Sequence, residues 1–157
     1  KITLEIGTCN GGTLFIWSNS TSEWVNTCDL NESKISEELS HKFVPKDSKC
    51  KILSLNGDSH NSDFLEEIKK ILNGRKVDFL FIDGDHTEAG VKQDYDMYNT
   101  LVRKGGLIAF HDVVEKQPIP QNQVYYFWEQ IKKTVDYEEF IHDSEQTGYG
   151  IGVIHVK

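Results

Sequence analysis

An apolar strand that leads through a glycine-rich turn into a helix opens the chain, and this junction limits the folds available to it. Residues 2–6 are mostly apolar, Gly7, Gly11 and Gly12 lie in the turn, and the predicted helix begins at about Thr13. Glycine permits positive φ and a close approach of a ligand to the backbone, and the first N–H groups of a helix can bind an electronegative group. The turn reads G-x-x-x-G-G, unlike the G-x-G-x-x-G of dinucleotide sites. We therefore expect a nucleotide-type cofactor here, and a turn needed only for packing is the alternative.

Strand-like and helix-like segments alternate along the rest of the 157 residues, with no internal repeat and no linker. This alternation predicts one α/β domain over residues 1–157, with a mostly parallel sheet. The strand-like segments after the turn are 23–28, 51–55, 77–82, 107–110, 137–142 and 149–156, and the helix-like ones are 31–43, 63–73, 88–103 and 124–135. Gly105 and Gly106 are expected to end the helix over 88–103.

Polar residues follow the second and third predicted strands, at the edge where open α/β sheets bind ligands. Asp29 comes about 20 residues after the glycine turn, where a carboxylate can hold a ribose diol, although an N-cap for the next helix explains it equally well. Asp58 and Ser59 follow the third strand and are placed to pair with a purine. A plain turn is an equal alternative for these two residues.

The fourth strand, residues 77–82, is a continuous apolar run typical of a central strand that is covered on both faces. It ends in Asp83-Gly84-Asp85-His86, and carboxylates this close together repel each other unless a cation or a proton is shared. The fifth strand ends in His111-Asp112. Asp83 and Asp112 thus follow neighbouring strands and are placed to share a divalent cation. A loop pair that caps backbone groups is the alternative for His111 and Asp112.

Composition excludes several classes of function. The formal net charge is −8, which argues against a nucleic-acid partner and favours a small molecule. No apolar run approaches the roughly 18 residues of a membrane span. Three widely spaced cysteines support neither a disulfide framework nor a zinc site, so we expect a cytoplasmic protein. The first residue is not Met, and N-terminal sequence is expected to be missing.

These motifs together resemble a class I S-adenosylmethionine-dependent methyltransferase, and most closely the metal-dependent small-molecule O-methyltransferases that include macrocin and mycinamicin O-methyltransferases and cephalosporin-hydroxylase-type proteins. The resemblance extends over nearly the whole chain. It rests on Glu5-Ile6-Gly7-Thr8, Gly11-Gly12-Thr13, the strand end at Asp29, Phe81 to His86, and Gly105-Gly106 before Phe110-His111-Asp112.

The resemblance implies a Rossmann-like doubly wound sheet of seven strands in the order 3-2-1-4-5-7-6, with the last strand antiparallel and helices on both faces. It also implies roles for individual residues. The turn with Glu5, Gly7, Thr8, Gly11, Gly12 and Thr13 would hold the methionine part of S-adenosylmethionine, Asp29 the ribose, and Asp58 with Ser59 the adenine. Asp83 would lie at the cofactor and, with Asp112, bind the metal, and His86 would be the general base.

One position departs from the family pattern. His111 stands where relatives usually carry an acidic residue. Imidazole suits manganese, iron or zinc better than magnesium. The sequence is therefore compatible with Mg, with Mn and with a site that binds no metal. The N-terminal helices that often cover the cofactor are also absent, and a homo-oligomer is one way to replace them. The resemblance further implies that His86 accepts the proton of the acceptor hydroxyl, while a metal at Asp83, His111 and Asp112 holds the oxygen.

We therefore predict an O-methyltransferase for a small hydroxylated molecule, such as a sugar or a natural product. One alternative is an NAD-dependent oxidoreductase on the same scaffold, against which the glycine spacing argues. A second alternative is an inactive module that binds S-adenosylmethionine, suggested by His111 and the short N-terminus.

Overall fold

The computed structural model describes residues 1–30 and 42–157. The strands are β1 (Ile2–Ile6), β2 (Trp24–Asp29), β3 (Lys51–Asn56), β4 (Val77–Ile82), β5 (Val102–His111), β6 (Asp136–Phe140) and β7 (Ile151–His155). The α-helices are α1 (Gly12–Ser20), α3 (Ser62–Leu72), α4 (Glu88–Tyr98) and α5 (Val124–Ile131), and Asn99–Leu101 and Lys132–Thr134 are 3-10 turns. Most of the helix predicted over 31–43 lies outside the described residues. Within the described residues, no helix has the length and apolar character needed to cross a membrane.

All seven strands form one sheet in the order β3-β2-β1-β4-β5-β7-β6. The pairs among β1 to β5 are parallel, and β7 is antiparallel to both β5 and β6. Ile6 pairs with Cys28 and Ile82, and Ile82 pairs with Phe110, so these strands end side by side. The predicted sheet and strand order are confirmed, and the polar residues that follow each strand meet at one edge.

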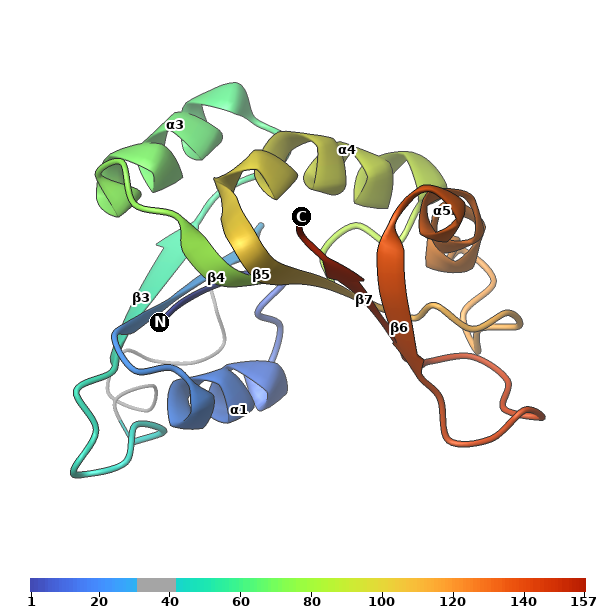
Figure 1. Cartoon of the computed structure of the whole chain (residues 1–157), viewed down its shortest axis with the longest axis horizontal. Helices are drawn as coiled ribbons and strands as arrows, with labels where there is room; N and C mark the ends of the chain where they lie inside the picture. Colours follow the sequence, from blue (N-terminus) through green and yellow to red (C-terminus); the bar gives the residue numbers. More distant parts are fainter. Residues whose placement is uncertain (31–41) are drawn as a thin grey trace.

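Helices cover both faces of the sheet (Figure 1). On one face α3, α4 and α5 bury the larger core, in which Phe64, Tyr98 and Trp128 are almost fully inaccessible. On the other face α1 contributes Leu14, and Trp17 of the same helix packs across Phe79 and Phe81 of β4. The strand β4 is therefore covered on both sides, as its continuous apolar run predicts.

The predicted end of the helix over 88–103 is wrong. The α-helix α4 stops at Tyr98, and β5 already begins at Val102, so both Gly105 and Gly106 lie inside the strand. The pairing of β4 with β5 shifts its register near this point, between Val77 and Phe79. A Cβ on Gly106 would lie 2.9 Å from a backbone oxygen of β4, and Gly105 has a φ of 68°. The two glycines therefore permit an irregular, close strand pairing and do not cap a helix.

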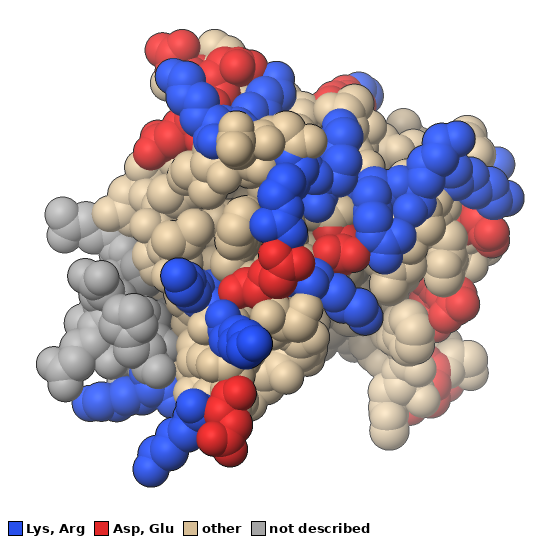
Figure 2. Space-filling model, turned by 60° about the vertical axis from the view of Figure 1, so that its left-hand side comes forward, with Lys and Arg blue, Asp and Glu red and all other residues tan. Residues whose placement is uncertain are grey.

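Lys and Arg side chains gather on the face shown in Figure 2, with Asp and Glu side chains between them. Ion pairs of this kind lie at the amino-terminal edge of the sheet, where Arg75 is 2.5 Å from Glu23 and Arg103 is 2.7 Å from Asp78. The carboxyl-terminal edge of the sheet carries a different set of side chains, which form the candidate site.

Candidate functional site

A cavity of about 710 Å³ lies at the carboxyl ends of β1 to β5. Loops that follow these strands line it, together with the loop between β6 and β7. Among the predicted site residues, the cavity is lined by Gly7, Asp29, Asp58, Ser59, Asp83, His86, His111 and Asp112. A volume of this size is in the range of small-molecule and cofactor sites.

Gly7 has a structural reason to be glycine. Its φ is 94°, and its N–H donates to the carbonyl oxygen of Cys28 at 2.9 Å. A Cβ on this residue would lie 2.0 Å from the backbone oxygen of Asp83. The ends of β1 and β4 can therefore approach each other only because position 7 has no side chain. A Gly7→Val variant would disturb this backbone contact as well as any bound cofactor, so it is a poor probe of binding.

The other residues predicted to bind the cofactor at the glycine turn do not line the cavity. Glu5 is fully buried, accepts hydrogen bonds from Trp17 Nε1 at 2.8 Å and Thr27 Oγ1 at 2.6 Å, and has its pKa raised by burial. Thr8 is buried and bonds to the hydroxyl of Thr27. Gly11, with a φ of 74°, is the N-cap residue of α1, whose first turn contains Gly12 and Thr13. Direct contact of these residues with a cofactor stays a prediction, because none of them lines the cavity.

Asp29 lines the cavity at the end of β2 and also shapes the glycine turn. Its Oδ2 accepts a hydrogen bond of 2.8 Å from the N–H of Cys9, which has a φ of 46°. The helix that Asp29 was alternatively expected to cap lies outside the described residues. The carboxylate therefore joins the first two strand ends, next to the space where a ribose was predicted.

The loop over residues 57–60 is fixed to α4 below it. Tyr98 donates from its hydroxyl to the carbonyl oxygen of Ser59 at 2.8 Å, and Gln93 Nε2 donates to the carbonyl oxygen of His60 at 3.3 Å. Asp58 Oδ1 accepts from the N–H of His60 at 2.9 Å, which closes the turn. Asp58 and Ser59 are thus held at the cavity by the helix that begins just after His86.

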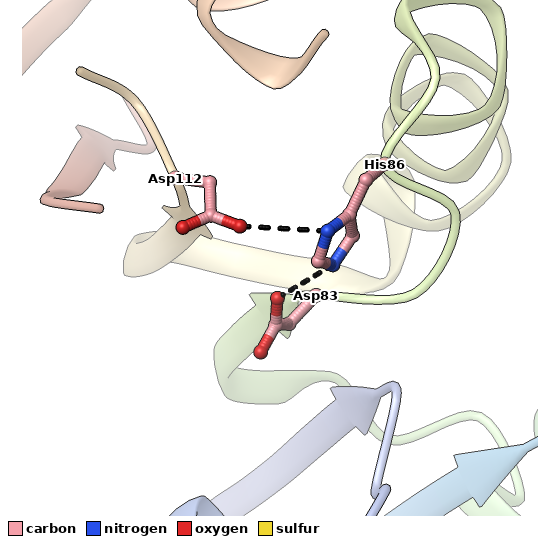
Figure 3. A group of neighbouring side chains, drawn as sticks. All are labelled: Asp83, His86 and Asp112. Carbon is pink, nitrogen blue, oxygen red and sulfur yellow. Dashed lines mark hydrogen bonds and ion pairs between the residues drawn. The ribbon is translucent and has the colours of Figure 1, made fainter. Parts of the chain in front are cut away.

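Asp83, His86 and Asp112 come together at the ends of β4 and β5, with the imidazole between the two carboxylates (Figure 3). His86 Nε2 is 3.0 Å from Asp83 Oδ1, and His86 Nδ1 is 3.4 Å from Asp112 Oδ2. One ligand atom from each of the three residues lies within 4.8 Å of the others, a spacing that suits a metal ion. The hydrogen bond to Asp83 raises the pKa of His86 above its ordinary value.

His111 lies against the same carboxylates. Its Nδ1 is 3.1 Å from Asp112 Oδ1 and 3.3 Å from Asp83 Oδ1, and these partners raise the pKa of His111 to about 10. Burial opposes the charge of Asp83, but His111 and His86 lower its pKa overall. Within the described residues, His111 Nδ1 and Asp112 Oδ1 are nevertheless buried without a hydrogen bond of regular geometry. The attraction between them is mainly one of charge.

Asn122 is a site residue that the sequence analysis missed. Its Nδ2 donates to Asp112 Oδ2 and lies 3.0 Å from His86 Nδ1, and the next residue, Gln123, donates its N–H to the carbonyl oxygen of His86 at 2.7 Å. Its place two residues before the predicted helix over 124–135, after a stiff proline loop, was the available signal. Asn122 therefore fixes the orientation of His86 relative to Asp112.

Asp94 is a buried carboxylate beneath the loop over 57–60. It lies on α4 and is fully inaccessible, and within the part of the chain that the structure describes no hydrogen bond of regular geometry reaches its oxygens. The Ser59 side chain and the Asp85 backbone lie near enough to lower its pKa, but burial outweighs them. The ring of His60 approaches it, with Nε2 at 3.3 Å from Oδ1. Burial raises the pKa of Asp94 from its ordinary value of 3.8 to about 6.

We expect Asp94→Asn to stabilise the protein near pH 7 by up to about 3 kcal/mol. A carboxyl whose pKa is raised by folding contributes stability below its unfolded pKa of 3.8, and this contribution is lost as the pH rises through about 6. An amide cannot ionise, so the free energy of unfolding of the variant should not fall as the pH rises through this range. Urea unfolding at about pH 4 and about pH 7 measures the difference, which should vanish at the lower pH. The same difference at both values would show that ionisation of Asp94 is not the cause.

A comparison with known families identifies the family of the chain. A family profile described as a methyltransferase domain matches residues 4–113. A curated relative, the uncharacterized protein R132 of Acanthamoeba polyphaga mimivirus, is 44% identical over 45 residues, which make up 29% of this chain and 20% of that protein. The chain thus matches only about a fifth of the length of this relative.

Solved structures share the fold. The O-methyltransferase from Bacillus cereus in complex with SAH has a TM-score of 0.67 and 21% identity, over 99% of this chain and 74% of that chain. The MycE methyltransferase of the mycinamycin biosynthetic pathway, in complex with Mg and SAH, has a TM-score of 0.66 and 18% identity, over 98% of this chain and 44% of that chain. At these identities the likeness concerns the arrangement of the sheet and helices.

Proposed function

The chain belongs to the methyltransferase domain family, and from this premise we propose that it transfers a methyl group from S-adenosylmethionine to a hydroxyl group of a small molecule. The observation that carries the proposal is the cluster of Asp83, His86 and Asp112 in the same cavity as Gly7 and Asp29. A carboxylate-bound cation and an imidazole base are the groups that such a transfer needs beside the cofactor. The acidic chain, with a net charge of −8, supports a small molecule over a nucleic acid.

The cofactor would occupy the side of the cavity formed by the ends of β1, β2 and β3. Position 7 has no side chain, so the backbone of the turn at Gly7 would hold the methionine part. Asp29 would accept hydrogen bonds from the ribose hydroxyls, and Asp58 with Ser59 would face the adenine. When bound, S-adenosylmethionine supplies an electrophilic methyl group on a sulfonium sulfur.

A divalent cation fits the donor atoms of the cluster. Asp112 Oδ1 and His111 Nδ1 are buried without a hydrogen bond among the described residues, and a cation would satisfy both if its binding releases the proton of His111. Asp83, Asp112 and His111 would hold it, and this mixed oxygen and nitrogen set suits manganese better than magnesium. When bound, such a cation supplies Lewis-acid chemistry that makes a hydroxyl easier to deprotonate.

His86 is the proposed base. Its neutral ring would keep the proton on Nε2 and donate it to Asp83, because Nδ1 faces the Asn122 amide. The Nδ1 lone pair would accept the proton of the acceptor hydroxyl once the acceptor displaces the Asn122 amide from it, and Asn122 would keep its bond to Asp112. In the transfer, the acceptor oxygen bonds to the methyl carbon, the bond from this carbon to sulfur breaks, and the proton stays on His86.

A module that binds the cofactor without catalysis is a second candidate. It is favoured by His111, which carries a positive charge between the two carboxylates at neutral pH and can take the place of a metal ion. Metal binding and turnover distinguish the two candidates, as argued in the Discussion.

Cofactor binding tests the premise common to both candidates. We expect Asp29→Ala to weaken binding of S-adenosylhomocysteine about ten- to hundredfold, because hydrogen bonds from the ribose to a charged group are lost. Calorimetry of the parent and the variant measures this change. Asp96→Ala, on the exposed side of α4, removes the same kind of side chain outside the cavity and should bind as the parent does. Equal affinities of all three proteins for S-adenosylhomocysteine would show that Asp29 does not bind the cofactor.

A further inference from the structure

The acceptor side of the cavity, which rests on the proposed function, is formed by the chain after β5 and by the loop between β6 and β7. Here Pro118, Ile119 and Tyr149 present exposed apolar surface, and Ile119 and Tyr149 are 61% and 55% exposed. These residues lie on the opposite side of Asp83 and Asp112 from the cofactor loops of β1 to β3. A methyl acceptor that reaches His86 would therefore rest on this apolar wall, formed by Pro118, Ile119 and Tyr149.

Tyr149 is held at the cavity in an unfavourable backbone conformation. Its φ is 57°, between Gly148 and Gly150 at 72° and 81°. Left-handed φ is uncommon for a bulky aromatic residue, and such conformations gather at ligand sites. The Tyr149 N–H donates to Gln117 Oε1 at 2.9 Å, and its ring centroid is 6.4 Å from that of His111. The loop thus places this ring beside the proposed reaction centre.

The polar amides on the same side already have partners. Gln117 Nε2 donates to the carbonyl oxygens of Asp112 and Val114, and its Oε1 accepts from Tyr149. Asn122 Nδ2 contacts Asp112 and His86, and its Oδ1 accepts from the N–H of Val124 at 3.2 Å. The two side-chain amides therefore offer little to the many hydroxyls of a sugar, whereas the apolar wall suits a flat ring.

The described lining of the cavity also lacks the side chains of Lys and Arg. None of its lining residues among those described is Lys or Arg, although the chain contains 17 of them and many are visible on the face in Figure 2. Five aspartates line it: Asp29, Asp58, Asp83, Asp85 and Asp112. The imidazole of His111 is charged, but it lies 3.3 Å from Asp83 and 3.1 Å from Asp112, which already neutralise it. A carboxylate or phosphate that faces the apolar wall, away from the proposed cation, would therefore lie unpaired in an acidic cavity.

We propose that the methyl acceptor is an uncharged aromatic hydroxy compound whose ring packs on Tyr149 and Ile119, and that carboxylated, phosphorylated and polyhydroxylated acceptors are excluded. Tyr149 is the residue that selects the ring, and the absence of Lys and Arg selects against anions. This narrows the class of small molecules that the fold alone leaves open.

Binding of three probes to protein saturated with S-adenosylhomocysteine tests the proposal without turnover. We expect 4-hydroxybenzyl alcohol to bind at least about tenfold more tightly than 4-hydroxybenzoate and than methyl glucoside. The first two probes differ by the carboxylate, and the third replaces the aromatic ring by a sugar. Equal affinity for the benzoate or the glucoside would overturn the proposal, and so would a protein that binds none of the probes at millimolar concentration.

Variants of the wall assign the selectivity to its residues. Tyr149→Asn keeps a residue that tolerates left-handed φ and removes the ring, so it should weaken binding of the alcohol about three- to tenfold, whereas Tyr149→Phe should retain it. Ile119→Lys, on the exposed loop, should improve binding of the benzoate relative to the alcohol. Tyr126→Asn removes an exposed ring outside the cavity and should change neither affinity. Parental binding by both Tyr149→Asn and Ile119→Lys would show that the wall does not contact the acceptor.

Failure of the proposed function gives a different result. If the protein does not bind S-adenosylhomocysteine, the proposed cofactor site is wrong. If the protein binds both S-adenosylhomocysteine and the alcohol but transfers no methyl group, the acceptor site is supported and the proposed catalysis is contradicted.

Discussion

His86→Ala is expected to lower methyl transfer by about 10² to 10⁴ while leaving the affinity for S-adenosylhomocysteine unchanged. The imidazole lies between Asp83 and Asp112, and a hydroxyl bound at this cluster would be within its reach. Alanine removes the proton acceptor without filling the cavity. Transfer of a labelled methyl group to an acceptor identified by the binding probes measures the loss, and calorimetry measures cofactor affinity.

The pH dependence of the parent gives a second readout of the same role. The hydrogen bond to Asp83 raises the pKa of His86, and a raised pKa keeps the imidazole protonated to higher pH. The acid limb of kcat/KM should therefore lie above the ordinary histidine value of about 6.5, and activity should increase as the pH rises through it.

His111→Ala is the informative comparison, because His111 faces the same carboxylates. If His86→Ala retained parental turnover and His111→Ala were inactive, the two histidines would exchange roles. If both variants lost methyl transfer while cofactor binding stayed intact, both histidines would be needed for the reaction.

The position of the site was predictable because it depends on strand ends. The apolar run over 77–82 indicates a central strand, and parallel strands end at the same edge of a sheet, so Asp83 and Asp112 had to meet there. The pairing of Ile82 with Phe110 puts the residues after them side by side. That relation follows from the order of elements alone and needs no knowledge of side-chain packing.

The role of Glu5 was less accessible to sequence reasoning. Its closeness to Gly7 in the sequence suggests the cofactor site, but alternate residues of a strand point to opposite faces. The Glu5 carboxylate lies under α1, where Trp17 and Thr27 bond to it, and not at the sheet edge. Its partners lie 12 and 22 residues away, and local patterns do not specify such distant pairings.

The positions of Asn122 and Tyr149 at the site could not be predicted from local sequence patterns either. Each lies on a loop whose course is set by packing against a distant element. Gln117 joins the loop after β5 to the β6–β7 loop through the Tyr149 N–H, 32 residues along the chain. The φ of 57° at Tyr149 has a sequence signal only in its two flanking glycines, Gly148 and Gly150.

The dependence on a cation is the second large effect. We expect exhaustive chelation to reduce turnover by about 10² or more, and a divalent ion, manganese most effectively, to restore it. Asp112→Asn should weaken manganese binding without unfolding the protein. Asp112 has a φ of 64°, and asparagine is among the few residues that tolerate this region, so the backbone can stay as it is. The variant therefore changes the charge of a ligand while its shape is retained.

Manganese binding followed by electron paramagnetic resonance reads out the site independently of activity. The parent should bind the ion, Asp112→Asn and Asp83→Asn should bind it more weakly, and Asp96→Asn, whose side chain lies on the exposed part of α4, should match the parent. The positive charge of His111 offers the alternative, since an imidazolium between Asp83 and Asp112 can stabilise the carboxylates without an ion. Full turnover after chelation, together with no manganese signal, would assign that role to His111 and leave His86 to act without a metal.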